Sequence, residues 1–122
     1  MAVQRFVVRV AGFVAKSDIP ARTCVKLSGT GDEIEKCTSA DDLVIGVSPE
    51  WETKAKQTAD IILLGGSIVD VGATSVPLGA RLGTGTDGKA VAAADGKPVF
   101  GIATSAGPAN GSCFFVTALG TR

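Results

Sequence analysis

The chain alternates between short apolar segments and polar turns along its whole length. Valine, isoleucine and threonine are frequent in the apolar segments, and a glycine or proline interrupts them about every ten residues, as in short strands joined by tight turns. The pattern therefore predicts an all-β fold. The expected strands cover residues 3–13, 23–27, 34–38, 43–47, 59–64, 67–71, 81–84, 90–93, 99–103 and 113–119.

The segments between these strands predict hairpin turns and at most one short helix. Positive-φ turns are expected at Gly66, Asp87-Gly88, Asp95-Gly96 and Asn110-Gly111. Residues 48–56 form the one plausible helical turn, because Ser48 can cap it, Pro49 suits its first position, and acidic residues precede lysines.

An internal repeat indicates that the strands form two related copies. Segment 19–25 (IPARTCV) and the later VIGVS are matched by segment 76–82 (VPLGARL) and the later VFGIA. Pro77 follows Pro20 by 57 residues, and Gly101 follows Gly46 by 55. The repeat predicts a small β-barrel or β-clip-like domain with a pseudo-twofold duplication, unless the similarity between glycine-rich strands arose by chance. The expected organisation is one domain over 1–122, with an arm or edge strand (1–14), a first copy (19–64), a connecting strand (65–75) and a second copy (76–119).

Composition narrows the function classes. A length of 122 residues suits one domain, and a mean hydropathy of +0.32 with zero net charge argues against disorder. The chain has no histidine and no tyrosine, so it lacks the imidazole of the usual nucleophile systems and of most zinc or haem sites. Few aromatic residues and balanced charge argue against nucleic acid as a partner. We expect no enzyme activity, no cofactor and no metal.

Cysteine usage and the N-terminal residues indicate a cytosolic origin. Cys24, Cys37 and Cys113 are odd in number and contain no C-x-x-C pair, so we expect buried free thiols. Two arginines interrupt the apolar N-terminal stretch, which argues against a signal peptide. The strongly apolar run 61–64 is too short to cross a bilayer.

Three motifs suggest chemistry but are better explained as turns. Residues 83–90 (GTGTDGKA) resemble phosphate-binding loops, yet Ala90 replaces the required hydroxyl and a Gly-Lys-Pro sequence leaves no room for the helix that such loops open. The Asn110-Gly111-Ser112 glycosylation pattern and the acidic clusters at 32–35 and 41–42 are also interpreted as turn residues.

Candidate partner-binding residues are Arg5, Phe6, Arg9 and Trp51. Arg5, Phe6 and Arg9 lie in a strand that has no assigned partner, so it either pairs with another chain or closes the protein's own barrel. Trp51 either anchors an interface or covers the barrel core. Residues 1–30 carry a net charge of +4 and residues 31–60 carry −5, which can guide one copy onto another or be neutralised within the chain.

The order of these segments resembles the small capsid decoration, or cement, proteins of tailed bacteriophages. The motifs that carry the resemblance are IPARTCVKL, DDLVIGVS, ADIILLGGSIVDVG and VPLGARLGTGTDGKAVAAADGKPVFGIATSA. The resemblance implies a β-barrel or β-clip-like domain that forms homotrimers. It also implies binding to the major capsid protein on the outer surface of the virion, without nucleic acid, membrane or cofactor.

A second resemblance keeps an alternative open. The stretch SIVDVGATSVPLGARL is similar to biotinyl or lipoyl carrier domains, which present a modified lysine at a hairpin tip. Lys89 would be that residue, although the flanking methionine is missing. A small-ligand-binding β module is the third possibility.

Overall fold

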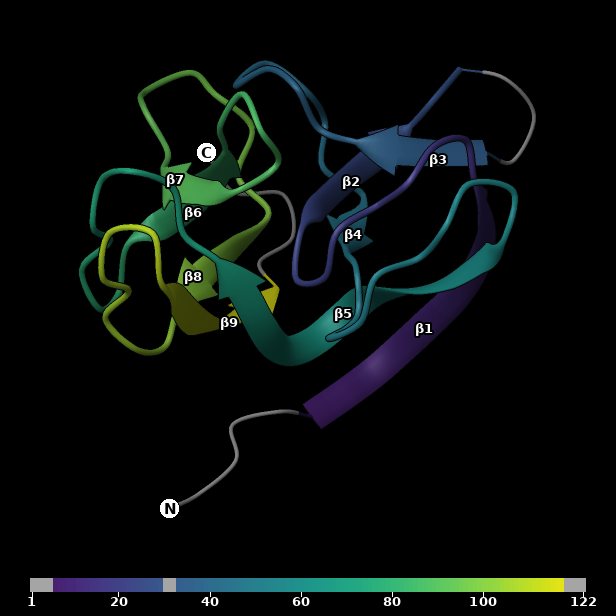
Figure 1. The fold of residues 1–122 in the computed structure, drawn as a ribbon. Helices are drawn as coiled ribbons and strands as arrows, with labels where there is room; N and C mark the ends of the chain where they lie inside the picture. Colours follow the sequence, from purple (N-terminus) through teal and green to yellow (C-terminus); the bar gives the residue numbers. More distant parts are fainter. Residues whose placement is uncertain (1–5, 30–32, 118–122) are drawn as a thin grey trace.

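The computed structural model describes residues 6–29 and 33–117, and for residues 6–11 it describes the backbone alone. This part of the chain contains nine strands and no helix (Figure 1). The strands are β1 (Phe6–Ala15), β2 (Cys24–Leu27), β3 (Glu33–Lys36), β4 (Gly46–Val47), β5 (Thr58–Asp70), β6 (Arg81–Thr84), β7 (Ala90–Ala92), β8 (Gly101–Ala103) and β9 (Ser112–Thr117). The expected all-β fold is confirmed.

The first five strands close into a barrel. They are hydrogen-bonded in the order β1-β3-β2-β4-β5, and β1 then pairs with β5 to complete the ring. The β1–β5 ladder is antiparallel and runs from Phe6 opposite Gly66 to Val14 opposite Thr58. Closure leaves few exposed strand edges in this half, because each strand has a neighbour on both sides for at least part of its length.

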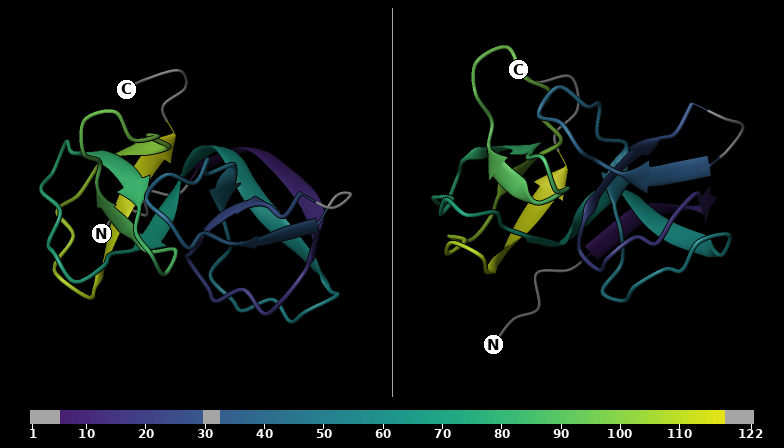
Figure 2. Two further views of the ribbon diagram at one scale, coloured as in Figure 1. Left: turned by 90° about the horizontal axis from the view of Figure 1, so that it is seen from above. Right: turned by 45° about the horizontal axis from the view of Figure 1, so that its top comes forward.

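Strand β5 is shared by both halves of the molecule. It has 13 residues and bends as it passes from the barrel to the second group of strands (Figure 2). The sequence predicts two strands with a turn at Gly66, and this prediction is wrong. Gly65, at φ 112, adopts a positive angle without ending the strand, and a glycine pair permits such a bend because it carries no Cβ.

The second half repeats the pairing of the first. The order β5-β9-β8-β6-β7 matches β1-β5-β4-β2-β3, with the C-terminal part of β5 in the place of β1. A parallel bridge from Val71 to Ala90 corresponds to the parallel β1–β3 pairing at Ala15 and Ile34. The predicted duplication is therefore present, and residues 65–71 occupy in the second copy the position that β1 occupies in the first.

Backbone details outside the strands also repeat. The antiparallel bridge between Ile19 and Thr53 has its counterpart between Val76 and Gly107. Arg22, at φ 51, occupies the turn that Gly79 fills in the second copy at φ 86. The two copies thus share turn geometry even where their residue types differ.

Two clusters of buried side chains form the core. One cluster lies inside the first barrel, around Ile19, Ile34 and Ile61. The larger cluster draws residues from both copies, among them Val47 and Phe115. The rings of Phe100 and Phe115 meet edge to face in it, with centroids 5.5 Å apart. Because the larger core is shared, the two copies are packed as one unit.

The segment predicted as a helical turn, 48–56, is not helical. The Ser48 hydroxyl donates to the carbonyl of Pro20 (2.7 Å) and accepts the N–H of Thr23 (2.9 Å), which ties the start of the segment to residues 20–23. Thr53 and Ile19 exchange two backbone hydrogen bonds. These long-range contacts satisfy backbone N–H and C=O groups that a helix would bond locally. The order of acidic residues before lysines suits a helix dipole, but it does not decide the structure.

Other predictions from the sequence are confirmed. All three cysteines are free and buried. The glycine-rich stretch 83–90 forms the β6–β7 hairpin, in which the N–H of Gly85 donates to the carbonyl of Lys89 and Gly88 has φ 79. A strand, not a helix, follows this turn, as expected if the phosphate-loop pattern is coincidental.

Gly46 and Gly101 occupy equivalent positions at which two strands approach closely. A Cβ on Gly46 would lie 2.6 Å from the carbonyl oxygen of Ile62, and a Cβ on Gly101 would lie 2.6 Å from that of Val116. Both contacts involve backbone of the adjacent strand, which cannot move aside without breaking its ladder.

We therefore expect Gly46→Ala and Gly101→Ala each to lower the free energy of unfolding by about 1–3 kcal/mol through overpacking. Gly72→Ala is the matched control, since the nearest atom to its added Cβ is 3.6 Å away. Urea denaturation measures the difference. Equal stabilities for all three variants would contradict the explanation.

Candidate partner-binding surface

Trp51 lies on the loop between β4 and β5 and is exposed. Its relative exposure is 55%, so it does not cover the barrel core, which was the alternative interpretation. Glu50 and Glu52 flank it and are also exposed. The result is an exposed aromatic ring between two acidic residues, and exposed tryptophans are frequent at partner contacts.

The loop that carries Trp51 is anchored to the rest of the barrel at its C-terminal end. Asp18 accepts the backbone N–H of Ala55 through a side-chain oxygen at 2.8 Å. Lys54 lies 3.3 Å from Glu52 and 3.7 Å from Asp18. The loop therefore has a defined shape, although these exposed ion pairs contribute little stability.

The N-terminal strand pairs within the chain. Phe6 lies opposite Gly66 and Arg9 opposite Leu64, so from Phe6 to Val14 the strand completes the protein's own barrel. The interpretation of this stretch as an arm that pairs with another subunit is thus wrong for the described residues, because the edge of β5 supplies its partner. Arg5 lies outside the described residues, and the side chains of Phe6 and Arg9 are not described. Their role in partner binding stays a prediction.

The other edge of β1 is only partly occupied. Strand β3 bonds to it at Val14 and Ala15, and within the described ranges no strand pairs with that edge between Phe6 and Phe13. Register shifts occur on either side of Arg9. Such irregularities twist an edge and limit continuous strand addition.

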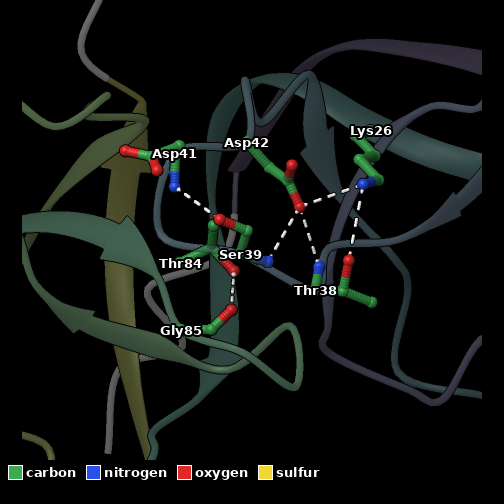
Figure 3. Close-up of polar contacts among 7 residues, drawn as sticks. All are labelled: Lys26, Thr38, Ser39, Asp41, Asp42, Thr84 and Gly85. Atoms are coloured by element: carbon green, nitrogen blue, oxygen red, sulfur yellow. Dashed lines mark hydrogen bonds and ion pairs between the residues drawn. The ribbon is translucent and has the colours of Figure 1, made fainter.

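Asp42 organises the loop that follows β3 (Figure 3). Its Oδ2 accepts the backbone N–H groups of Thr38 (2.8 Å) and Ser39 (2.9 Å). The same oxygen lies 3.1 Å from Nζ of Lys26. Neighbouring Asp41 pairs with Lys97 of the second copy. The acidic pair therefore shapes a turn, as the sequence predicts.

These contacts set the ionisation of Asp42. Partial burial disfavours its charged form, but the N–H of Thr38 and the ammonium of Lys26 outweigh burial and hold the pKa of Asp42 below its usual 3.8. The hydrogen bond to Asp42 in turn raises the pKa of Lys26. Because the folded-state pKa of Asp42 is depressed, its stabilisation is present above the unfolded-state value and is lost as pH falls through the folded-state value.

We expect Asp42→Ala to lower the free energy of unfolding by about 1 kcal/mol at neutral pH. The deficit relative to the parent protein should shrink as pH falls below about 4. Urea titrations across this range measure it. Asp42→Asn keeps a carbonyl acceptor for the two N–H groups and lacks the charge. We expect a smaller loss of unfolding free energy in this variant, and that loss measures the contribution of the ion pair with Lys26. A deficit that does not change with pH would rule out the ionised carboxylate as the cause.

Sequence reasoning missed an apolar groove at the junction of the two copies. Leu43 is 72% exposed, and it forms one wall of a cavity of about 200 Å³. The groove is lined by Leu43, Val44, Ile45, Gly46, Val47, Ile62, Leu63, Val99, Phe100, Phe115 and Thr117. The sequence places Leu43 in a strand, and its only signal of exposure is the preceding pair of aspartates.

The described residues contain no group of three or more histidine, cysteine or acidic side chains arranged to hold a metal ion. The same part of the chain has no helix with the length and apolar character needed to span a membrane.

The fold is similar to that of a solved phage protein. The structure described as the head fiber gp8.5 N base of bacteriophage phi29 matches with a TM-score of 0.70 and 22% sequence identity, over 90% of this chain and 93% of that chain. The likeness to phage capsid-associated proteins expected from the sequence is thus confirmed at the level of the fold. No protein-family model and no curated protein sequence matches the chain.

Proposed function

We propose that the protein is a structural component of a bacteriophage head that binds the outer surface of the capsid. The observation that carries the proposal is the likeness of nearly the whole fold to the N base of a phage head fiber. Because the match covers 93% of that chain, the two proteins share a complete domain rather than a common β motif.

Within this role, we propose the finer assignment of a decoration, or cement, protein. It binds the major capsid protein, stabilises contacts between neighbouring capsid subunits and acts as a homotrimer. The exposed Trp51 between two glutamates supports a docking function, because a large aromatic ring on an anchored loop can be buried with little loss of conformational entropy.

The state of the cysteines supports a role without catalysis. Burial raises the pKa of the Cys37 thiol to about 11 and also raises the pKa values of Cys24 and Cys113. A thiol with a raised pKa carries little thiolate at neutral pH and is a poor nucleophile. The cysteines therefore act as small apolar core residues.

The geometry of the β6–β7 hairpin disfavours the carrier-domain alternative. The carbonyl of Gly88 accepts the N–H of Cys24 at 2.8 Å, so the hairpin tip is docked on the first copy. A Cβ on Gly88 would lie 2.6 Å from Thr23 Cγ2. Lys89, next to this tip, is half-buried. A carrier domain must present its modified lysine freely to separate active sites, which a docked tip prevents.

Co-sedimentation with heads assembled from the major capsid protein of the same phage tests the proposal. The parent protein is expected to pellet with the heads and to raise their melting temperature. Trp51→Ala should weaken binding by about tenfold or more. Leu78→Ala is the matched control, because Leu78 is similarly exposed, at 67%, on another turn.

The outcomes separate the coarse proposal from the fine one. If the parent protein fails to bind the heads, the capsid role is contradicted. If it binds without changing their melting temperature, the cement function is contradicted and the structural role remains. If both variants bind equally well, Trp51 is not the docking residue.

A further inference from the structure

Two of the three cysteines lie opposite each other at one end of the β2–β3 hairpin. The two strands are antiparallel with Val25 opposite Lys36, and the next pair in this register is Cys24 and Cys37. The N–H of Cys37 donates to the carbonyl of Cys24 at 3.0 Å. Residues that face each other in this way place their side chains on the same side of the sheet. Both thiols accordingly pack in the larger core cluster.

The spacing of such a pair suits a disulfide. In a hydrogen-bonded antiparallel pair the Cα atoms are about 5.5 Å apart, and disulfides join Cα atoms that are roughly 4.4–6.8 Å apart. The two thiols also share a neighbour, since a hydrogen bond with the Thr84 side chain lowers the pKa of each. Cys24 and Cys37 can therefore be joined with little movement of the backbone.

The second copy shows that this position does not require cysteine. Its equivalent residues are Arg81 and Ala93, which follow the pair Leu82 and Ala92 in the register of β6 and β7. The N–H of Ala93 donates to the carbonyl of Arg81 at 2.8 Å. The same backbone pairing forms there without a thiol, so the repeated framework does not explain why both positions of the first copy carry cysteine.

We propose that Cys24 and Cys37 are a modification site at which an intrachain disulfide forms. The oxidant is a small-molecule disulfide such as glutathione disulfide. The thiolate of Cys37 attacks it, forms a mixed disulfide and releases one glutathione. The thiolate of Cys24 then attacks the sulfur of Cys37 and releases the second glutathione. The protein thiols lose two protons and two electrons, which glutathione disulfide takes up as it becomes two thiols.

Burial makes this exchange slow in the folded protein. Both cysteines are fully buried. Burial raises the pKa of Cys37 to about 11 and the pKa of Cys24 well above its ordinary value. Because only a thiolate attacks a disulfide, the reaction needs local opening or refolding of the chain. In a reducing compartment the pair therefore remains as two apolar core residues.

The disulfide joins two points that are already tied to neighbouring segments. The N–H of Cys24 donates to the carbonyl of Gly88 in the β6–β7 hairpin, and Cys37 precedes Thr38, whose N–H donates to Asp42. The bond closes the β2–β3 hairpin covalently and lowers the entropy of the unfolded chain. Its setting, a phage head that leaves the reducing interior of a cell, rests on the proposed function, whereas its chemistry does not.

Refolding the full chain from urea in a buffer of reduced and oxidised glutathione tests the proposal. Thiols that remain free are then alkylated under denaturing conditions and counted by intact mass. The parent protein should take up one alkyl group instead of three. Trypsin should release peptide 23–26 linked to peptide 37–54, because it cleaves after Arg22, Lys26, Lys36 and Lys54.

Cys113→Ala is the matched control, since Cys113 lies opposite Val69 and not opposite either thiol of the pair. This variant should form the same link and keep no free thiol, whereas Cys37→Ala should keep two. The oxidised parent should melt about 5 °C or more above the reduced parent. The same oxidant should leave the melting temperature of Cys37→Ala unchanged.

Three results would overturn the proposal: three free thiols after refolding with oxidised glutathione, a main product that links Cys24 or Cys37 to Cys113, or an oxidised parent that melts no higher than the reduced one. All of these measurements use the isolated protein. A failure to bind heads therefore leaves the disulfide standing, and a missing disulfide leaves the capsid role standing.

Discussion

The structure depends on one strand that belongs to both halves of the molecule. The first part of β5 closes the barrel against β1, and its second part bonds to β9 and begins the second copy. Gly66 pairs with Phe6 of β1 and with Val116 of β9. A strand can form hydrogen bonds along both of its edges, so β5 lies between β1 and β9 at this point. Any change that shifted its register would move side chains of both halves to the wrong face.

The shared strand makes the duplicated chain a single body. Strand β4 lies close to β5 at Gly46, and the equivalent strand β8 lies close to β9 at Gly101. At both glycines the adjacent backbone leaves no space for a side chain. The larger core takes residues from both copies, and the β6–β7 hairpin docks on the start of β2. The inward faces of the strands are occupied by packing, so groups available for partners lie on the loops, on strand edges and at outward-facing strand positions such as Leu27.

Two loops of the first copy differ from the corresponding loops of the second copy and carry exposed apolar side chains. The loop with Trp51 corresponds to residues near Ser105, and the loop with Leu43 corresponds to residues near Pro98. In the first copy, Trp51 lies between two glutamates and Leu43 follows two aspartates, and hydrogen bonds fix the loop near each of them. The repeated framework packs the core, and the two copies differ most in these loops.

The sequence alone determines the class of fold and most of its strands. The strands at 23–27, 81–84 and 90–93, the buried cysteines and the hairpin at 83–90 follow from local alternation and turn chemistry, and the repeat predicts the duplication. These features depend on residues close together in the chain. Local patterns therefore contain enough information to predict them.

Only the tertiary structure decides where the strands pair and what is exposed. Segment 48–56 has helix-compatible charges, but hydrogen bonds to Pro20, Thr23 and Ile19 hold it in a non-helical conformation. The N-terminal strand pairs with a distant segment, from Val14 opposite Thr58 to Phe6 opposite Gly66, and the turn expected at Gly66 becomes a bend inside β5. The groove at Leu43 exists because two distant loops meet at the junction of the copies. Each of these outcomes depends on which surfaces long-range packing brings together, and a local pattern does not encode that.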